Sequence, residues 1–420
     1  MTSITRRSFT TAALTVAAAS SLPLGGTLAQ AKPIRIGFSI AQTGSLASGG
    51  KAGLLALQIW RDQTNAAGGI LGRPVELVGY DDQSNGANTP GIYAKLIDVD
   101  KVDLLLSPYG SNVAMPIMPL IARKNRLLFG MLAIGVNESI KSDRFFSMGP
   151  WGGETTNIYG AFMELAKEKG LKSIAILASD ANYQQIVSDG ARKFARENGM
   201  TIVLDSKYPV NLVDFTGVLQ SLKSKAPDVV FVCSYPGETV AIIQGIEEVG
   251  LPGSVQLFGG GMIGLQFASV FESLGGKVNG IVNNLLFPTE LSRKSKIATE
   301  VMEAFALRAK AEKIDHLGLH NPPFWYATGQ VIKAAVEATG GTDDQAIATW
   351  LRSNEVDTIV GPIRWDEGGE WIENRVYMVQ FQGIGNGNVE QFRDPGKVVI
   401  VSPKPYRTGD VKMPFAAARS

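Results

Sequence analysis

Ser111 and Asn112 are the side chains best placed for binding chemistry, because they lie between an apolar run, residues 102–106, and the start of a helical pattern. The run predicts a buried strand, and Ser111 or Asn112 is the natural N-cap of the helix. The connecting loop, which contains Tyr109, offers free backbone N–H groups and the positive end of a helix dipole. It could hold a carboxylate or a phosphate, although an ordinary strand-to-helix turn has the same sequence.

Residues suited to catalysis are scarce, since the chain has two histidines, His316 and His320, and one cysteine, Cys233. The histidines are spaced i, i+4 and could share a helix face as metal ligands, but no glutamate follows His316 and no third ligand is indicated nearby. Cys233 follows the apolar run 229–232, which predicts a buried strand residue that forms no internal disulfide. We therefore predict no metal site, no catalytic residue and no enzyme, although carboxylates alone could still serve in acid–base catalysis.

Two glycine-rich stretches resemble nucleotide-binding motifs, and each departs from its motif at a residue that the chemistry needs. Residues 44–52 resemble a phosphate loop, but Ala52 stands where the hydroxyl ligand of Mg²⁺ is required. We interpret the loop around Leu46 as part of a receptor cleft. Residues 259–264 match G-x-G-x-x-G after a predicted strand, but the next strand ends at Asn283 and Asn284 and not at an acid. No cofactor is predicted.

The N-terminal segment has the pattern of an export signal. Residues 5–9 carry a twin arginine, an Ala-rich run follows at residues 12–24, and residues 29–31 form a small-residue cleavage site. The run is short and contains Pro23, so it is too weak to span a bilayer. We predict export by the twin-arginine machinery, cleavage near Ala31 and a periplasmic location.

Charge and length limit the remaining classes. Removal of the export signal takes away two arginines, so Lys plus Arg falls from 40 to 38 against 39 acids, and the net charge changes from +1 to −1. Such a balance argues against nucleic acid or an anionic membrane as a partner. The chain is far longer than one hydrophobic core needs, which predicts two domains.

Strand patterns alternate with helical patterns through most of the chain. Strands are predicted at residues 34–40, 75–80, 102–106, 126–131, 173–178, 201–208, 228–233, 254–258, 279–284, 361–365 and 376–381. Helices are predicted at residues 52–67, 88–99, within 151–170, and at 183–198, 215–225, 238–249, 292–313, 322–339 and 344–352. This alternation indicates an α/β fold with parallel sheets covered on both faces, in which ligands bind at the carboxyl ends of the strands.

Several short stretches add a family resemblance. In chain order they are Ile36-Gly37, residues 65–74 (NAAGGILGRP), Tyr80-Asp81-Asp82 and residues 356–369 (VDTIVGPIRWDEGG). In order and spacing they resemble the leucine/isoleucine/valine-binding family of periplasmic solute receptors for ABC importers. The resemblance covers nearly all of the chain after residue 31.

The resemblance implies the type I periplasmic binding protein fold, in which two Rossmann-like αβα lobes are joined by three hinge crossings. The crossings would lie near residues 148–153, 281–286 and 361–365. Residues 32–150 and 284–362 would form lobe one, residues 151–283 and 363–403 lobe two, and residues 404–420 a C-terminal tail. Such a protein is a monomer that closes around a small solute and delivers it to the permease subunits of an ABC importer. A periplasmic sensory receptor that signals to a membrane protein would leave the same sequence pattern.

The resemblance also implies a set of ligand-binding residues. Ser111 matches a serine that holds an α-carboxylate in this family, and the loop 132–135 matches the second carboxylate-binding element. Tyr183 and Tyr235 match tyrosines on the other side of the cleft, although both could be packing aromatics. The expected set consists of Leu46, Tyr109, Ser111, Asn112, Ala133, Ile134, Tyr183, Tyr235 and Gly261.

The partners of an α-ammonium group are missing from the matched positions. The position of a hydroxyl is occupied by Ile134 or Gly135, and the position of a glutamate by Gly261. Burial of an ammonium without partners costs several kcal/mol. We therefore hypothesise a carboxylate ligand without an α-amino group, an aromatic or aliphatic acid, for which the glycines would leave room. Glu238 or Glu154 could supply a counter-charge and would leave amino acids open.

Overall fold

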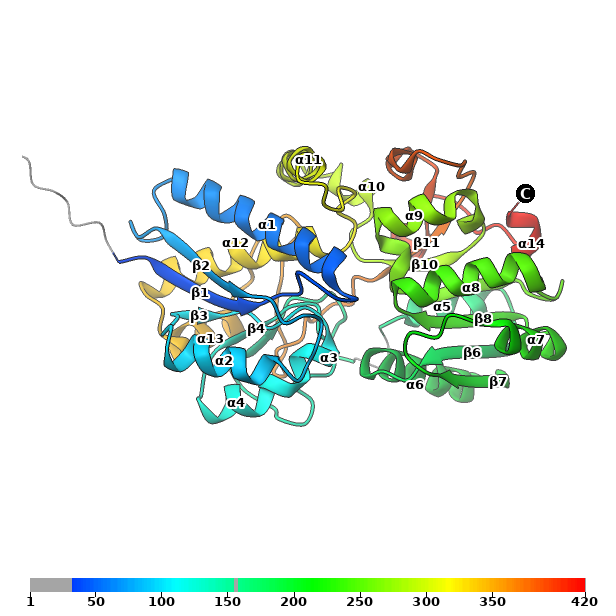
Figure 1. The fold of residues 1–420 in the computed structure, drawn as a ribbon, viewed down its shortest axis with the longest axis horizontal. Helices are drawn as coiled ribbons and strands as arrows, with labels where there is room; N and C mark the ends of the chain where they lie inside the picture. Colours follow the sequence, from blue (N-terminus) through cyan, green and yellow to red (C-terminus); the bar gives the residue numbers. More distant parts are fainter. Residues whose placement is uncertain (1–31, 155–157, 420) are drawn as a thin grey trace, which may run out of the picture.

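The computed structural model describes residues 32–154 and 158–419, which form two α/β lobes side by side (Figure 1). The predicted export signal, residues 1–31, lies outside the described residues. Within the described ranges, no helix is both long and apolar enough to cross a membrane.

Short parallel strands form the sheet of the first lobe. A bridge between Leu106 and Phe129 joins its two groups of strands. The groups are β2-β1-β3 and β4-β5, with bounds β1 (Ile34–Ser39), β2 (Val75–Tyr80), β3 (Leu104–Leu105), β4 (Leu128–Gly130) and β5 (Phe145–Ser147).

Helices cover both faces of this sheet, as the packing of alternate side chains along β3 and the residue after it shows. Successive side chains of a strand point to opposite faces. Leu104 and Leu106 lie in the apolar cluster that includes residues of α1 (Ala47–Ala66) and α12 (Asn321–Thr339). Leu105 lies in the cluster that includes residues of α2 (Thr89–Asp98) and α4 (Met118–Arg123). An apolar run without polar alternation is therefore what this position requires. The other helices of this lobe are α3 (Ser111–Ala114), α11 (Lys296–Ala311) and α13 (Asp344–Ser353), and the short α10 (Thr289–Ser292) leads from the second lobe into α11.

The second lobe is built on a seven-stranded sheet in the order β12-β11-β10-β9-β8-β6-β7. The pairs from β10 to β7 are parallel, and β11 and β12 are added antiparallel at one edge. The strands are β6 (Ser173–Ser179), β7 (Thr201–Tyr208), β8 (Val229–Ser234), β9 (Leu257–Met262), β10 (Val282–Leu285), β11 (Tyr377–Phe381) and β12 (Val398–Ser402). The helices around them are α5 (Gly160–Glu168), α6 (Asn182–Glu197), α7 (Thr216–Lys225), α8 (Pro236–Val249) and α9 (Ala268–Leu274) (Figure 1).

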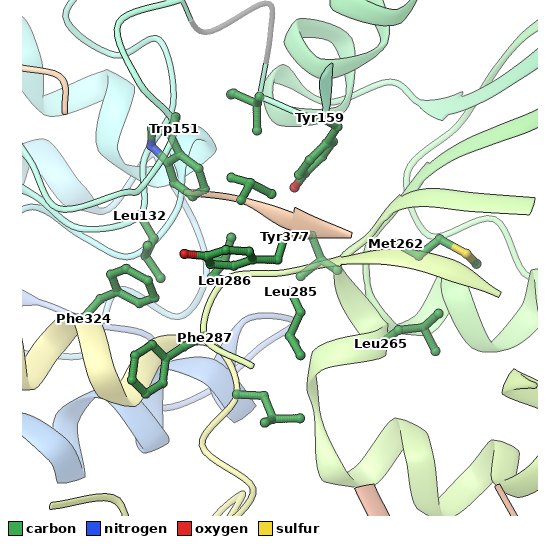
Figure 2. Packing of buried hydrophobic residues seen from close by; sticks show 14 of the residues in the cluster. Leu132, Trp151, Tyr159, Met262, Leu265, Leu285, Leu286, Phe287, Phe324 and Tyr377 are labelled. Carbon is green, nitrogen blue, oxygen red and sulfur yellow. The ribbon is translucent and has the colours of Figure 1, made fainter. Parts of the chain in front are cut away.

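The chain crosses between the two sheets after β5, after β10 and before β11. Side chains from all three crossings meet in one apolar cluster. Figure 2 shows Trp151 from the first crossing, Leu286 and Phe287 from the second, and Tyr377, which follows the third. The two lobes are thus connected by a packed apolar region.

The lobes also touch away from these crossings, through the loop between α11 and α12. The carboxylate of Asp315 accepts a hydrogen bond from the Ala268 N–H at the start of α9, at 2.5 Å. Arg393 of the second lobe donates to the Leu317 carbonyl of the same loop at 3.2 Å. This loop therefore joins the first lobe to a helix end of the second.

The predicted strand at 361–365 is wrong. Only isolated bridges form there, between Val356 and Ile363 and between Trp365 and Trp371. The indole N–H groups of both tryptophans donate to the same Ser147 carbonyl, at 2.7 and 2.9 Å. These bonds place residues 365–371 beside β5 in the first lobe, whereas the sequence analysis assigned residues from 363 onward to the second.

Three strands, β5, β9 and β12, differ from the prediction. The strand predicted at 254–258 forms at Leu257–Met262, so Gly259, Gly260 and Gly261 lie inside β9 and not in a loop after a strand. Hydrogen bonds to β8 and β10 override the low strand propensity of glycine. The strands β5 and β12 were not predicted, and they pair with β4 and β11 respectively. The buried-strand prediction for Cys233 is confirmed.

Candidate functional site

A small cavity lies where the carboxyl ends of strands from both lobes face each other. Six residues of the expected set line it. They are Leu46, Tyr109, Ser111, Ile134, Tyr183 and Tyr235. The other lining residues are Gly110, Leu132, Trp151, Tyr159, Ile263, Leu286 and His320. Asn112, Ala133 and Gly261 do not line the cavity.

Ser111 stands at the start of α3, directly after the loop that follows β3. It is buried, and its Oγ accepts a hydrogen bond from the Ile134 N–H at 2.8 Å. The serine therefore joins the loops that follow β3 and β4. Because the hydroxyl uses a lone pair for this bond, its own proton remains available for an acceptor in the cavity.

Asn112 lies behind Ser111 and reaches the opposite lobe. Its Nδ2 donates to the hydroxyl of Tyr235 at 2.8 Å. A second bond across the cleft runs from Asn182 Nδ2 to the sulfur of Met115 at 3.4 Å. Asn112 thus contributes to contact between the lobes, where the sequence analysis expected a ligand contact.

Three tyrosines form the wall contributed by the second lobe. The rings of Tyr183 and Tyr235 stack at 6.1 Å between centroids, and the hydroxyls of Tyr159 and Tyr183 are hydrogen-bonded to each other. Burial raises the pKa of each of these phenols. They are therefore neutral hydroxyls that can donate or accept.

Gly261 is enclosed in β9 and does not provide space for a ligand. A Cβ at this position would lie 3.0 Å from the Cys233 sulfur and 3.2 Å from the ring of Tyr159. The missing side chain makes room for Tyr159, which in turn lines the cavity. The expectation that the glycines leave room for a bulkier ligand is wrong at this position, because Tyr159 occupies that volume.

Neutral groups supply the polarity of the cavity. None of the described lining residues is acidic, and none is a lysine or an arginine. Glu238 accepts from the backbone N–H groups of Tyr235 and Asn211 at 2.9 Å each, and Glu154 is exposed and paired with Lys193 at 2.6 Å. Neither acid lines the cavity. Trp151 does, and its buried indole N–H has no partner among the described residues.

His320, Gln266 and Tyr109 form a hydrogen-bonded chain at the cavity wall. The Tyr109 hydroxyl lies 2.9 Å from His320 Nε2, and His320 Nδ1 lies 2.8 Å from Gln266 Oε1. Burial lowers the pKa of His320 to about 3, so the imidazole is neutral. The sequence analysis considered His320 only as a metal ligand, and no group of three possible metal-binding side chains occurs in the described part of the chain.

The remaining residues that sequence reasoning missed come from the crossings and from neighbouring loops. Trp151, Tyr159 and Leu286 are apolar or aromatic residues in stretches without a binding motif. Ile263 lies within the G-x-G-x-x-G match at residues 259–264 and follows directly after β9, so its place at a strand end could have pointed to it. Trp151 and Leu286 reach the cavity because the crossings pass beside it.

Comparisons with known proteins place this geometry in a family. A family model described as "Periplasmic binding protein" matches residues 33–388. A curated relative, the "Leu/Ile/Val-binding protein homolog 8" of Brucella abortus, is 28% identical over 240 residues, which span 56% of this chain and 59% of that protein. The chain thus aligns with somewhat more than half the length of this relative.

Solved structures show the same fold. A solute-binding protein of an ABC transporter from Rhodopseudomonas palustris, in complex with 3,4-dihydroxybenzoic acid, has a TM-score of 0.71 at 21% identity and covers 84% of this chain and 94% of its own. The substrate-binding protein of a branched-chain amino acid transporter from Streptococcus pneumoniae, in complex with isoleucine, has a TM-score of 0.71 at 20% identity, with coverage of 89% and 100%. The match over residues 33–388 and the two-lobed type I fold together show that this chain belongs to the periplasmic binding protein family.

Proposed function

We propose that the protein is an extracytoplasmic solute receptor that captures a small carboxylic acid without an α-amino group and delivers it to an ABC importer. The observation that carries the proposal is the make-up of the cavity, which combines Ser111 and the Trp151 indole N–H with aromatic walls and has no acid among its described lining residues. Closure of the two lobes around the ligand would bury it between these walls.

Neutral hydrogen-bond donors in the cavity can hold the carboxylate group of the proposed ligand. The Ser111 hydroxyl can donate once its oxygen has accepted from Ile134 N–H, and the indole of Trp151 is a donor with no acceptor function. Hydrogen bonds from neutral donors to a carboxylate are charge-assisted and stronger than those to neutral acceptors. A buried carboxylate can therefore be held here without a lysine or an arginine.

The cavity has no carboxylate among its described lining residues to pair with an ammonium group, and this argues against amino acids as ligands. An ammonium group in this cavity would face tyrosine hydroxyls and apolar side chains, while Glu238 and Glu154 are paired elsewhere. The cost of several kcal/mol for an unpaired buried ammonium corresponds to roughly a thousandfold or more in affinity. The flat faces of Tyr183, Tyr235 and Tyr159 favour a planar or aliphatic body beside them.

Two solved relatives of the same fold were crystallised with an aromatic acid and with isoleucine respectively. At 21% and 20% identity they establish the fold, and the choice between the two ligand classes for this chain depends on its own cavity. The family relationship supports a role as a binding component, and the twin-arginine pattern supports export to the periplasm.

Thermal-shift screening followed by calorimetry tests the proposal. The purified chain without residues 1–31 is screened against aromatic acids, aliphatic acids and amino acids, and hits are titrated. We expect 3-phenylpropanoate or 4-methylpentanoate to bind at least a thousandfold tighter than phenylalanine or leucine, their amino counterparts. Tight leucine or phenylalanine binding with no response to the deaminated acids would contradict the proposal.

A further inference from the structure

The hydrogen-bonded series Tyr109–His320–Gln266 has no role in the function proposed above. It connects two cavity-lining residues of the first lobe, Tyr109 and His320, to Gln266 of the second lobe. His320 is the residue before α12 in the first lobe, and Gln266 ends the 3-10 turn Ile263–Gln266 in the second. All three side chains are at most 5% exposed. The His320 ring also packs edge-on against Phe267, at 5.6 Å between centroids, and against Tyr109, at 5.7 Å.

The direction of the hydrogen bonds in this chain follows from the groups at its ends. A neutral imidazole has one nitrogen that donates and one that accepts. The Gln266 amide is oriented with Oε1 2.8 Å from Nδ1. In this orientation Nδ1 carries the proton and donates to Oε1. Nε2 must then accept, and the donor to it is the hydroxyl of Tyr109 at 2.9 Å.

This direction decides what Tyr109 can offer to a ligand. Because its only proton is used toward His320, the phenol oxygen faces the rest of its surroundings with lone pairs alone. Tyr109 and His320 both line the cavity. Burial raises the pKa of the Tyr109 phenol, and the neighbouring Asn321 offsets part of this rise, although its amide nitrogen has no partner within hydrogen-bond geometry among the described residues. Even a bond from Asn321 would leave the second lone pair of the phenol oxygen free.

We infer that Tyr109, fixed by His320 and Gln266, is an acceptor that selects ligands with a hydrogen-bond donor, so that the solute is a hydroxylated carboxylic acid. The inference rests on the proposed function, since it concerns the part of the ligand remote from the carboxylate-binding donors. Ser111 and Trp151 supply donors for the acid group, whereas Tyr109 supplies an acceptor. A cavity with donors at one place and an acceptor at another requires a ligand with both kinds of group.

Matched ligand pairs test the inference by calorimetry on the purified chain. The first set compares benzoate with 2-, 3- and 4-hydroxybenzoate, and the second compares 4-methylpentanoate with 2-hydroxy-4-methylpentanoate. Within the set that binds, we expect one hydroxylated acid to bind at least about tenfold tighter than its parent, because a buried acceptor left without a donor weakens binding.

Two variants test whether the preference for the hydroxylated acid depends on Tyr109, His320 and Gln266. Tyr109→Phe should bring the ratio of the two affinities to within about twofold of one. Gln266→Leu should lower the ratio as well, because Nδ1 loses its acceptor and the proton can move to Nε2. A change that only loosens the structure would weaken both acids alike and keep the ratio. Tyr326→Phe, which removes a hydroxyl bonded to Gln63 at 2.6 Å, is the matched control and should leave the ratio unchanged.

The possible outcomes separate the two proposals. Parent acids that bind as tightly as every hydroxylated analogue would overturn this inference and leave the carboxylate receptor standing. A preference that survives in Tyr109→Phe would overturn it too. If no carboxylic acid binds and amino acids do, the proposed function itself fails. Should Gln266→Leu not fold, the wild-type ratio and Tyr109→Phe still decide the question.

Discussion

Single hydroxyl groups carry most of the polar character of the cavity, and serines of one loop illustrate how similar residues can have different roles. Ser107 and Ser111 each accept a hydrogen bond from a backbone N–H after β4, those of Met131 and Ile134, at 2.8 Å. Both serines are buried. Only Ser111 lines the cavity. Both serines therefore make the hydrogen bond to the loop after β4, but only Ser111 is expected to contact a ligand.

This difference gives a prediction with an internal control. Ser111→Ala should weaken binding of the best carboxylic acid about 10- to 100-fold, because a hydrogen bond to a charged group contributes about 1.5–3 kcal/mol. Ser107→Ala should change affinity less than about twofold. Both variants should lower the melting temperature by similar amounts, because each loses one bond to the loop after β4. Calorimetry and thermal melts of both variants measure the two effects. Equal losses of affinity would show that Ser111 acts only through the loop.

At the scale of elements, the first lobe depends on close packing between α1 and α12. Glycines on both helices leave space for tryptophans of the partner helix. A Cβ at Gly53 would lie 2.7 Å from the Trp325 ring, and one at Gly329 would lie 2.1 Å from the Trp60 ring. Gly50 faces backbone instead, since its Cβ would lie 1.9 Å from the Ala41 carbonyl oxygen. The helices can approach so closely only because these positions lack side chains.

Gly50→Ala should therefore destabilise the protein by about 2 kcal/mol or more, because a backbone carbonyl cannot move aside as a side chain can. Gly91→Ala on α2 is the matched control, since nothing lies within 4 Å of a Cβ there. Alanine has the higher helix propensity, so this variant should be neutral or more stable by about 0.5–1 kcal/mol. Urea unfolding of both variants tests the comparison. A neutral Gly50→Ala would show that α1 can shift.

The segment that follows the third predicted crossing, residues 361–365, contains a buried acid, Glu370, with a measurable pH effect. Glu370 is 7% exposed, and its Oε2 has no partner in the described part of the chain. Burial, with smaller contributions from Asp366 and Glu138, raises its pKa from 4.5 to about 8. The folded state thus keeps a proton that the unfolded state loses between these values. The free energy of unfolding must fall as pH rises from about 4.5 to about 8.

Glu370→Gln removes this titration. The variant should match wild type below about pH 4.5 and be more stable by at least about 1 kcal/mol at pH 8, where the wild-type protein bears the cost of the buried acid. Denaturant unfolding at several pH values measures the difference. Glu367→Gln, at an exposed neighbour, should keep the wild-type slope. A stability gain that is the same at pH 4 and pH 8 would assign the effect to packing.

Sequence reasoning succeeded for elements with strong local signals and failed where tertiary contacts decide. Amphipathic α6 and α13 and the apolar strands β6 and β8 were predicted to within about two residues. The glycines of β9 and the residues around Trp365 have no local preference that matches their structure. In the cavity, Ser111 could be found because it lies between a strand and the start of a helix, although Gly110 and not Ser111 is the N-cap of α3. Tyr159 and His320 depend on contacts that span the chain.

At the scale of the whole molecule, the proposed function requires that the receptor meets its ligand outside the cytoplasm. Replacing Arg6 and Arg7 with lysine should leave the precursor in the cytoplasm, because the twin-arginine pathway reads the arginine pair. Cell fractionation with immunodetection of precursor and mature forms measures the result. A mature form that reaches the periplasm at the normal rate would contradict the twin-arginine prediction.

The contact of Asp315 with the start of α9 has a consequence for how affinity is set. Opening of the lobes would exchange the bond to the Ala268 N–H for bonds to water, so this contact helps to determine the fraction of empty protein that is already closed. The apparent dissociation constant equals the intrinsic constant divided by that fraction. Substitutions at Asp315 would thus multiply the dissociation constants of all ligands by one common factor. Affinity could then be tuned from a loop outside the cavity while the ranking of ligands stayed the same.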